Sequence, residues 1–158
     1  MPKPKFSLTY DVEALLALVE PIDHQILGIW ARECANRVMA YFEAAFPDDP
    51  RPRQALETLQ AWIDTGEFSM AVIRKASLDA HAAAREVGED SPARSAARAA
   101  GQAVATAHVP THSVGAANYA LQAIHRASDD EEAAGAVAAE RAWQRQRLEE
   151  LWTPTANH

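Results

Sequence analysis

Alanine makes up roughly a fifth of this 158-residue chain, far above its average usage in globular proteins. Alanine has the highest helix propensity, whereas the β-branched residues that favour strands form almost no runs here. No segment alternates between apolar and polar residues with the period of two that is typical of a half-buried strand. Apolar positions recur instead at steps of three and four along most of the chain. The sequence therefore predicts an all-α protein.

Prolines, glycines and capping residues divide the chain into helical segments. The predicted helices cover residues 11–19, 23–46, 53–66, 69–88, 92–128 and 129–152. Pro110 cannot donate a backbone hydrogen bond, so we expect the long fifth element to be kinked or split there. We therefore predict a single helical domain over residues 1–158, built as a bundle of six or seven helices. Residues 1–10 and 153–158 are expected to form flexible tails.

The chain is acidic, with a formal net charge of −7 at pH 7. Phosphate binding needs a basic surface, so we expect no nucleic-acid partner, and an anionic membrane surface would repel the chain. No apolar run reaches the ~18 residues of a membrane span, and residues 1–10 lack the apolar core of a signal peptide. Cys34 is the single cysteine, in an apolar helical segment that is typical of a buried, unreactive thiol. These observations favour a cytoplasmic protein.

The segment HVPTHSVGAANYA, residues 108–120, places His108 and His112 four residues apart. If the helix continues through this segment, both histidines share one stripe with small residues, among them Gly101 and Gly115. Small residues on a helix face allow a neighbouring helix to approach closely. The pattern therefore favours a helix-packing seam in which both imidazoles are enclosed.

Enclosed imidazoles need hydrogen-bond partners. Candidate partners are Asp79 and a backbone carbonyl left free by Pro110. The alternative interpretation is a metal site in which His81 joins the histidine pair as a third ligand. The segment lacks the glutamate of an HExxH zinc motif, but the sequence leaves both interpretations open.

The segment FPDDPRPRQALE, residues 46–57, combines three prolines with two aspartates and two arginines. These charged residues are Asp48, Asp49, Arg51 and Arg53. They could bind phosphate or a divalent ion. The prolines favour a rigid turn, in which the aspartates cap the next helix and the arginines form ion pairs.

Acidic residues and tryptophans near the C-terminal end are candidates for binding a partner protein. They are Asp129, Asp130, Glu131, Glu132, Glu149, Glu150, Trp143 and Trp152. We expect residues 130–132 in the first turn of the last helix, where acids complement the helix dipole. Exposed carboxylates would steer a basic partner. The tryptophans lie on an amphipathic segment, where they either pack in the core or contribute to an interface.

Sequence motifs of common enzyme classes are missing. There is no GxxxxGK[ST] phosphate loop, no GxGxxG after a strand and no GxSxG nucleophile elbow. We therefore assign no catalytic residue and expect no cofactor.

Four segments carry a resemblance to a known family. They are FPDDPRPRQALE (46–57), AHAAARE (80–86), ARAAGQAVATAHVPTHSVGAANYA (97–120) and ERAWQRQRLEEL (140–151). The chain resembles an immunity-five-like family of small bacterial helical proteins, the proposed partners of polymorphic toxin systems. The third segment is the most specific of the four.

The resemblance implies an all-helical, non-catalytic protein that binds and neutralises a cognate toxin without a cofactor. The residues themselves leave two alternatives open. One is a metal-binding or small-ligand-binding protein, or an enzyme, that uses His81, His108 and His112. The other is a homo-oligomeric helical module.

Overall fold

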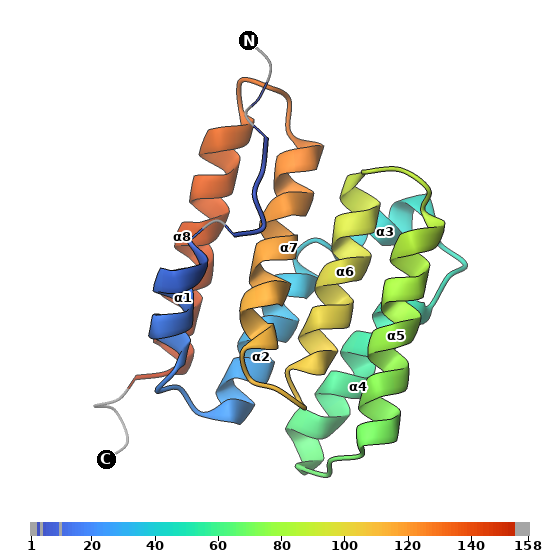
Figure 1. The fold of residues 1–158 in the computed structure, drawn as a ribbon, viewed down its shortest axis with the longest axis vertical. Helices are drawn as coiled ribbons and strands as arrows, with labels where there is room; N and C mark the ends of the chain where they lie inside the picture. The colour runs from blue at the N-terminus through green and yellow to red at the C-terminus, as the bar shows by residue number, and fades with distance from the viewer. Residues whose placement is uncertain (1–2, 4, 10, 154–158) are drawn as a thin grey trace.

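A computed structural model describes residue 3, residues 5–9 and residues 11–153 (Figure 1). Residues 1–2, 4 and 10 of the expected N-terminal tail, and residues 154–158 of the C-terminal one, lie outside this description. The described chain contains eight helices and no strand. The helices are α1 (Val12–Val19), α2 (His24–Asn36), α3 (Met39–Ala45), α4 (Arg51–Thr65), α5 (Met70–Glu86), α6 (Pro92–Ala105), α7 (His112–Ala127) and α8 (Ala133–Leu151). The all-α prediction is confirmed, and the predicted count of six or seven helices was too low.

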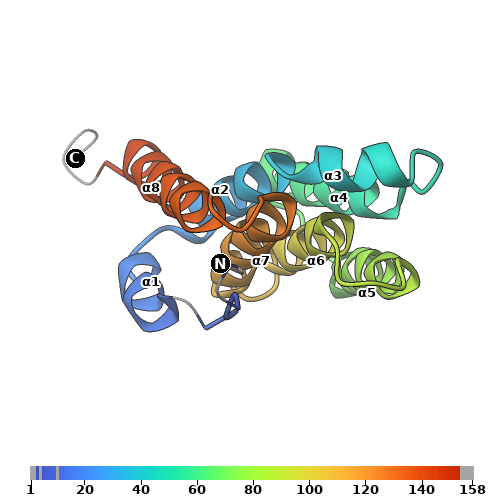
Figure 2. The same cartoon turned by 90° about the horizontal axis from the view of Figure 1, so that it is seen from above.

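The helices form two layers when the molecule is seen from above (Figure 2). α8, α2, α3 and α4 make one layer, and α1, α7, α6 and α5 make the other. Within the second layer α6 packs against both α7 and α5, and α7 also contacts α2 and α8 in the first layer. None of the described helices is long and apolar enough to cross a membrane.

Two apolar clusters lie between these helices. The larger cluster contains residues of every helix from α2 through α7. It is rich in alanine, with Phe42 and Leu56 among its few large side chains. Alanine ends at Cβ, so helices that meet through it can approach closely. The smaller cluster joins α1, α2, α7 and α8 around Trp30 and Leu148. The indole of Trp30 is fully buried, and its Nε1 donates a hydrogen bond to the Gln144 carbonyl at 2.8 Å, so the ring's polar atom is satisfied.

Local signals in the sequence set several helix ends. The Asp23 carboxylate accepts hydrogen bonds from the first backbone N–H groups of α2, and the Ser69 and Ser91 hydroxyls do the same for α5 and α6. Gly66 follows α4 with φ +71°, and Gly88 lies just beyond α5 with φ +83°. Both angles fall in the left-handed region that glycine adopts without strain.

The predicted helix over residues 23–46 is divided into α2 and α3, which accounts for the extra helix. Val38 adopts φ −110° and ψ 0°, and its N–H bonds the carbonyl three residues back. The reorientation buries Val38, Met39 and Phe42 in the larger cluster, whereas Trp30 and Cys34 of α2 lie in the smaller one. One straight helix would present Trp30, Cys34, Val38 and Phe42 along one side, at steps of four residues. Packing therefore breaks a segment that contains neither proline nor an internal stop signal.

The long fifth element is split near Pro110, as predicted. α6 ends at Ala105, and α7 begins at His112. In the turn between them, the N–H groups of Thr106, Ala107 and His108 bond carbonyls three residues back, which tightens the end of α6.

Candidate functional site

The α6–α7 turn places the two histidines of HVPTHSVGAANYA in different environments. His108 lies in the turn itself and is exposed, with its ring centroid 6.1 Å from that of Phe68. His112 is the first residue of α7 and is half-buried. The expectation that both imidazoles are enclosed was therefore wrong for His108. The prediction that both histidines share one helix face assumed a continuous helix. In the structure, α6 ends at Ala105, so the helical periodicity stops before residue 108.

His112 forms a hydrogen bond that joins α7 to α6. Its Nδ1 lies 2.8 Å from Oε1 of Gln102, and an amide oxygen can only accept, so His112 Nδ1 carries the proton. Gly115 lies against the same glutamine, and a Cβ at this position would come 2.7 Å from Gln102 Oε1. Burial, and then His108, lowers the pKa of His112. The glycine therefore makes room for a side-chain contact between the two helices.

His81 on α5 contacts α6 in a similar way. Its Nδ1 lies 3.1 Å from Nη1 of Arg98, and a guanidinium group can only donate, so His81 is the acceptor. A Cβ at Gly101 would come 2.6 Å from His81 Nε2, so this glycine leaves room for the ring. Burial, and then the charges of Arg98 and Arg85, lowers the pKa of His81 to about 4. The imidazole is therefore neutral at neutral pH, with its proton on Nε2.

The three histidines do not converge. Among the described residues, no group of three or more His, Cys, Asp or Glu side chains is arranged to hold a metal ion. His81 bonds Arg98, His112 bonds Gln102 and His108 lies near Phe68. Asp79, an expected histidine partner, forms an ion pair with Lys75 instead. The His81 ring fills the space that Gly101 leaves, and Gln102, the partner of His112, lies against Gly115, so both contacts hold helices together.

Arg51 anchors the turn before α4. Its guanidinium bonds Asp49 and also reaches Glu86 at the end of α5, with shortest distances of 2.7 and 2.9 Å. Asp49 Oδ1 also accepts a hydrogen bond from the Arg51 backbone N–H, at 3.1 Å. The side-chain bond from Arg51 lowers the pKa of Asp49 and that of Glu86. These groups satisfy one another.

Arg53 connects the same turn to α2 and α3. It bonds Glu43 at 2.7 Å and Asn36 Oδ1 at 2.6 Å. Asp48 is exposed and forms no ion pair with any residue in the described ranges. The charged side chains of the turn therefore fasten α2, α3, α4 and α5 to one another, and Asp48 alone points to solvent.

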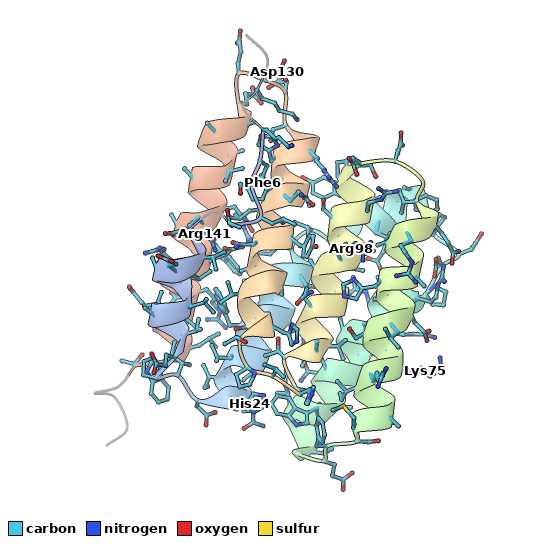
Figure 3. The ribbon with its side chains drawn as sticks, in the orientation of Figure 1. Phe6, His24, Lys75, Arg98, Asp130 and Arg141 are labelled. Carbon is cyan, nitrogen blue, oxygen red and sulfur yellow. The ribbon has the colours of Figure 1, made fainter. Side chains whose placement is uncertain are left out.

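The acidic residues at 129–132 lie in the loop between α7 and α8. Residues 130–132 were expected in the first helical turn, but α8 begins only at Ala133, and no side chain caps its first N–H groups. The N–H groups of Glu132 and Ala133 bond the Asp129 carbonyl and close a turn before the helix. All four acidic side chains are exposed, and Figure 3 shows Asp130 at the tip of the molecule. We call residues 129–132 the acidic loop.

The other candidate partner-binding residues lie elsewhere. Glu149 and Glu150 are in the last turn of α8, about 25 Å from Glu132 at 1.5 Å per residue. Trp143 is half-buried beneath Arg37, whose guanidinium carbon lies 3.8 Å from the ring centroid. Trp152 is half-buried against the smaller cluster. The structure therefore does not gather the acids and tryptophans into one patch.

α8 has a polar inner face that sequence patterns missed. Arg141 is buried and donates hydrogen bonds to Gln144, at 2.6 Å, and to Asn118 of α7. Glu140, also buried, accepts two hydrogen bonds from Arg37, the shorter at 2.7 Å. The outer face of α8 is made largely of small exposed residues, among them Ala134, Gly135, Ala138 and Ala139. The expectation of an amphipathic helix was therefore wrong for α8, because several of its buried side chains are polar and several of its exposed ones are alanine.

Sequence comparison identifies the class to which this helical protein belongs. The family model described as "Imm-5 like putative immunity protein" matches residues 17–151, nearly the whole chain. The chain is a member of this immunity-protein family. No curated protein and no solved structure gives a significant match.

Proposed function

We propose that this protein is a non-catalytic immunity protein that binds and neutralises a cognate toxin in the cytoplasm, with the acidic loop as the centre of its binding surface. Membership of the immunity-protein family supports the function. One observation supports the surface: four consecutive acidic side chains are exposed and form no ion pair with any described residue. No other segment of the sequence has four consecutive acidic residues, so negative charge is most concentrated in the acidic loop.

The charge of the acidic loop suits a basic partner. Lys3 lies close by, but its Nζ donates to the carbonyls of His125 and Ser128, at 2.7 and 2.9 Å, and leaves the carboxylates free. Uncompensated surface charge of one sign attracts an oppositely charged protein and can raise its association rate by about 10- to 1,000-fold. A basic toxin would therefore be captured rapidly.

The outer face of α8 extends this surface. Its small side chains give a partner close access to the helix, and Glu149 and Glu150 lie at its far end. A toxin that spans the length of α8 would reach both acidic groups. Trp143 and Trp152 are half-buried and would contribute to the edge of such an interface.

The function is tested by expressing growth-inhibiting products of the neighbouring genes with and without the protein. We expect the wild type to restore growth, and an Asp130→Lys/Glu131→Lys variant to lose much of this protection. The matched control is Glu67→Lys/Glu89→Lys, which changes the net charge equally at exposed positions outside ion pairs. Failure of the wild type to protect or to bind the toxin would refute the function. Equal protection by the two variants would refute the surface.

A further inference from the structure

Three arginines on the face formed by α5 and α6 have no carboxylate partner. Arg74, Arg85 and Arg98 form no ion pair with any residue in the described ranges. The arginines with carboxylate partners are Arg37, Arg51, Arg53, Arg94, Arg126, Arg145 and Arg147. The α5–α6 face therefore carries uncompensated positive charge on a chain whose net charge is −7.

Arg98 is held in place by a neutral group. The half-buried imidazole of His81 accepts its hydrogen bond, and this ring is neutral for the reasons given above. A neutral acceptor orients the guanidinium without cancelling its charge. Figure 3 shows Arg98 midway along α6. Because Arg98 bonds no carboxylate among the described residues, its remaining N–H groups are available to an external one.

An apolar pocket adjoins these arginines. It has a volume of about 270 Å³ and is lined by Met70, Ile73, Arg74, Ser77, Leu78, Ala105 and His108. Met70 and Leu78 are 44% and 55% exposed, and Phe68 at the start of this face is 47% exposed. Side chains this apolar are usually buried, and a group of them around a pocket is typical of a binding surface.

Direct contacts connect the pocket to Arg74 and Arg98. Ser77, which lines the pocket, donates from Oγ to the Gly101 carbonyl at 3.0 Å. Gly101 in turn lies against the His81 ring that holds Arg98. Arg74 itself lines the pocket. One ligand could therefore occupy the pocket and reach the guanidinium groups at once.

We propose that this α5–α6 surface binds a protein segment in which carboxylates flank a large apolar side chain. The apolar side chain would enter the pocket, and the carboxylates would bond the guanidinium groups of Arg74, Arg85 and Arg98, which match a carboxylate's geometry. A pocket of this size holds one or two side chains and is smaller than a typical cofactor site. The net charge of −7 opposes an extended polyanion such as nucleic acid or an anionic bilayer, but not a short acidic segment.

This surface is distinct from the acidic loop and opposite in charge, so the inference does not rest on the proposed toxin binding. It predicts a second partner, or a second point of contact, with a different sequence preference.

The test is an NMR titration of the full ¹⁵N-labelled chain with a short blocked peptide that carries glutamates on both sides of one leucine. Two control peptides replace the glutamates by glutamine or the leucine by serine. We expect chemical-shift changes on α5 and α6 with the first peptide, and affinity weaker by about tenfold for either control. Equal binding of the glutamine peptide, or shifts confined to other helices, would overturn the proposal.

Matched variants localise the charge effect. Arg74→Glu/Arg85→Glu should weaken binding by about tenfold or more, and Arg74→Gln/Arg85→Gln by less. Lys75→Glu is the control, because Lys75 is adjacent in sequence but lines the groove between α4 and α5 and points away from α6 (Figure 3). An equal loss in the Lys75 variant would overturn the proposal.

Other occupants give distinguishable results. Shifts on α5 and α6 that depend on protein concentration without peptide, and disappear in the Arg74/Arg85 variants, would mean that a second copy binds here. Tighter binding of an oligonucleotide or of anionic phosphatidylserine vesicles at the same residues would mean a polyanion. Either result would overturn the assignment to an acidic protein segment.

Discussion

Gly101→Ala would introduce a single methyl group between α5 and α6. The new Cβ would lie 2.6 Å from Nε2, 2.8 Å from Cδ2 and 2.9 Å from Cε1 of His81. These distances are far shorter than a van der Waals contact, so the ring has to move. Moving it separates His81 Nδ1 from Arg98 Nη1, which are 3.1 Å apart in the wild type.

Three effects determine the size of the change. Alanine in place of glycine within a helix stabilises it by about 1 kcal/mol. Adding a methyl group to a well-packed contact costs about 1–3 kcal/mol, and loss of the hydrogen bond costs a further 0.5–1.5 kcal/mol or so. We therefore expect Gly101→Ala to lower the free energy of unfolding by about 2 kcal/mol. For a chain of this length this corresponds to a fall in Tm of about 4–8 °C.

The assay is urea unfolding of Gly101→Ala, His81→Ala and the double variant. With the ring removed, Gly101→Ala should instead raise the free energy of unfolding by about 0.5–1 kcal/mol, since only the gain in helix propensity remains. Gly135→Ala is the matched control. Gly135 is also within a helix, but nothing lies within 4 Å of a Cβ there, so the same gain is expected.

Two results would refute this reasoning. One is a stabilisation by Gly101→Ala in the wild-type background that equals the effect of Gly135→Ala. The other is an unchanged destabilisation when His81 is absent, because the clash would then not be with the ring.

Three further predictions concern titration and pairing. The pKa of His81 is about 4 in the folded chain, against about 6.5 when unfolded, so the unfolded state binds more protons between these values. The contribution of His81 to stability is therefore complete above about pH 6.5 and is lost as the pH falls toward 4; a pH-independent difference in unfolding free energy between wild type and His81→Gln would contradict this. Burial raises the pKa of the Cys34 thiol, so a thiol reagent should label the protein only after denaturation, and rapid labelling of the native chain would show that the thiol is accessible. Arg37→Ala should lower the free energy of unfolding by about 2 kcal/mol in urea, because buried Glu140 loses two charged hydrogen bonds. Arg37→Lys should lose less, and equal losses would point to an effect other than charge.

Signals confined to a few adjacent residues predicted the fold well. Asp23, Ser69 and Ser91 cap helices where the sequence placed caps, and Gly66 ends α4. Pro110 divides the long element. These signals are reliable because a cap, a left-handed glycine or a missing N–H acts on the backbone within one turn.

The two errors in the helices arise from packing and turn geometry. The α2–α3 boundary has no proline or glycine and forms because Val38 and Phe42 reach the larger cluster. The start of α8 was placed too early because acids near a helix start resemble a dipole-compensating first turn. In the structure, the Asp129 carbonyl closes a separate turn, and α8 begins at Ala133.

The candidate site was predictable only in part. The small residues Gly101 and Gly115 do mark close contacts, but with side chains, His81 and Gln102, whose positions depend on how the helices fold back on one another. The pairing of His81 with Arg98 could not be read from the sequence for the same reason. The α5–α6 surface could have been predicted from the sequence, because Arg74, Leu78 and Arg85 recur with His81 at helical spacing along α5.

The most direct test of toxin binding through the acidic loop is the association rate constant of the purified toxin with this protein, measured by stopped flow over a range of salt concentrations. We expect fast association that slows steeply with salt, and a rate at least about tenfold lower for Asp130→Lys/Glu131→Lys than for Glu67→Lys/Glu89→Lys at low salt. Equal rates and equal salt dependence in the two variants would contradict the account.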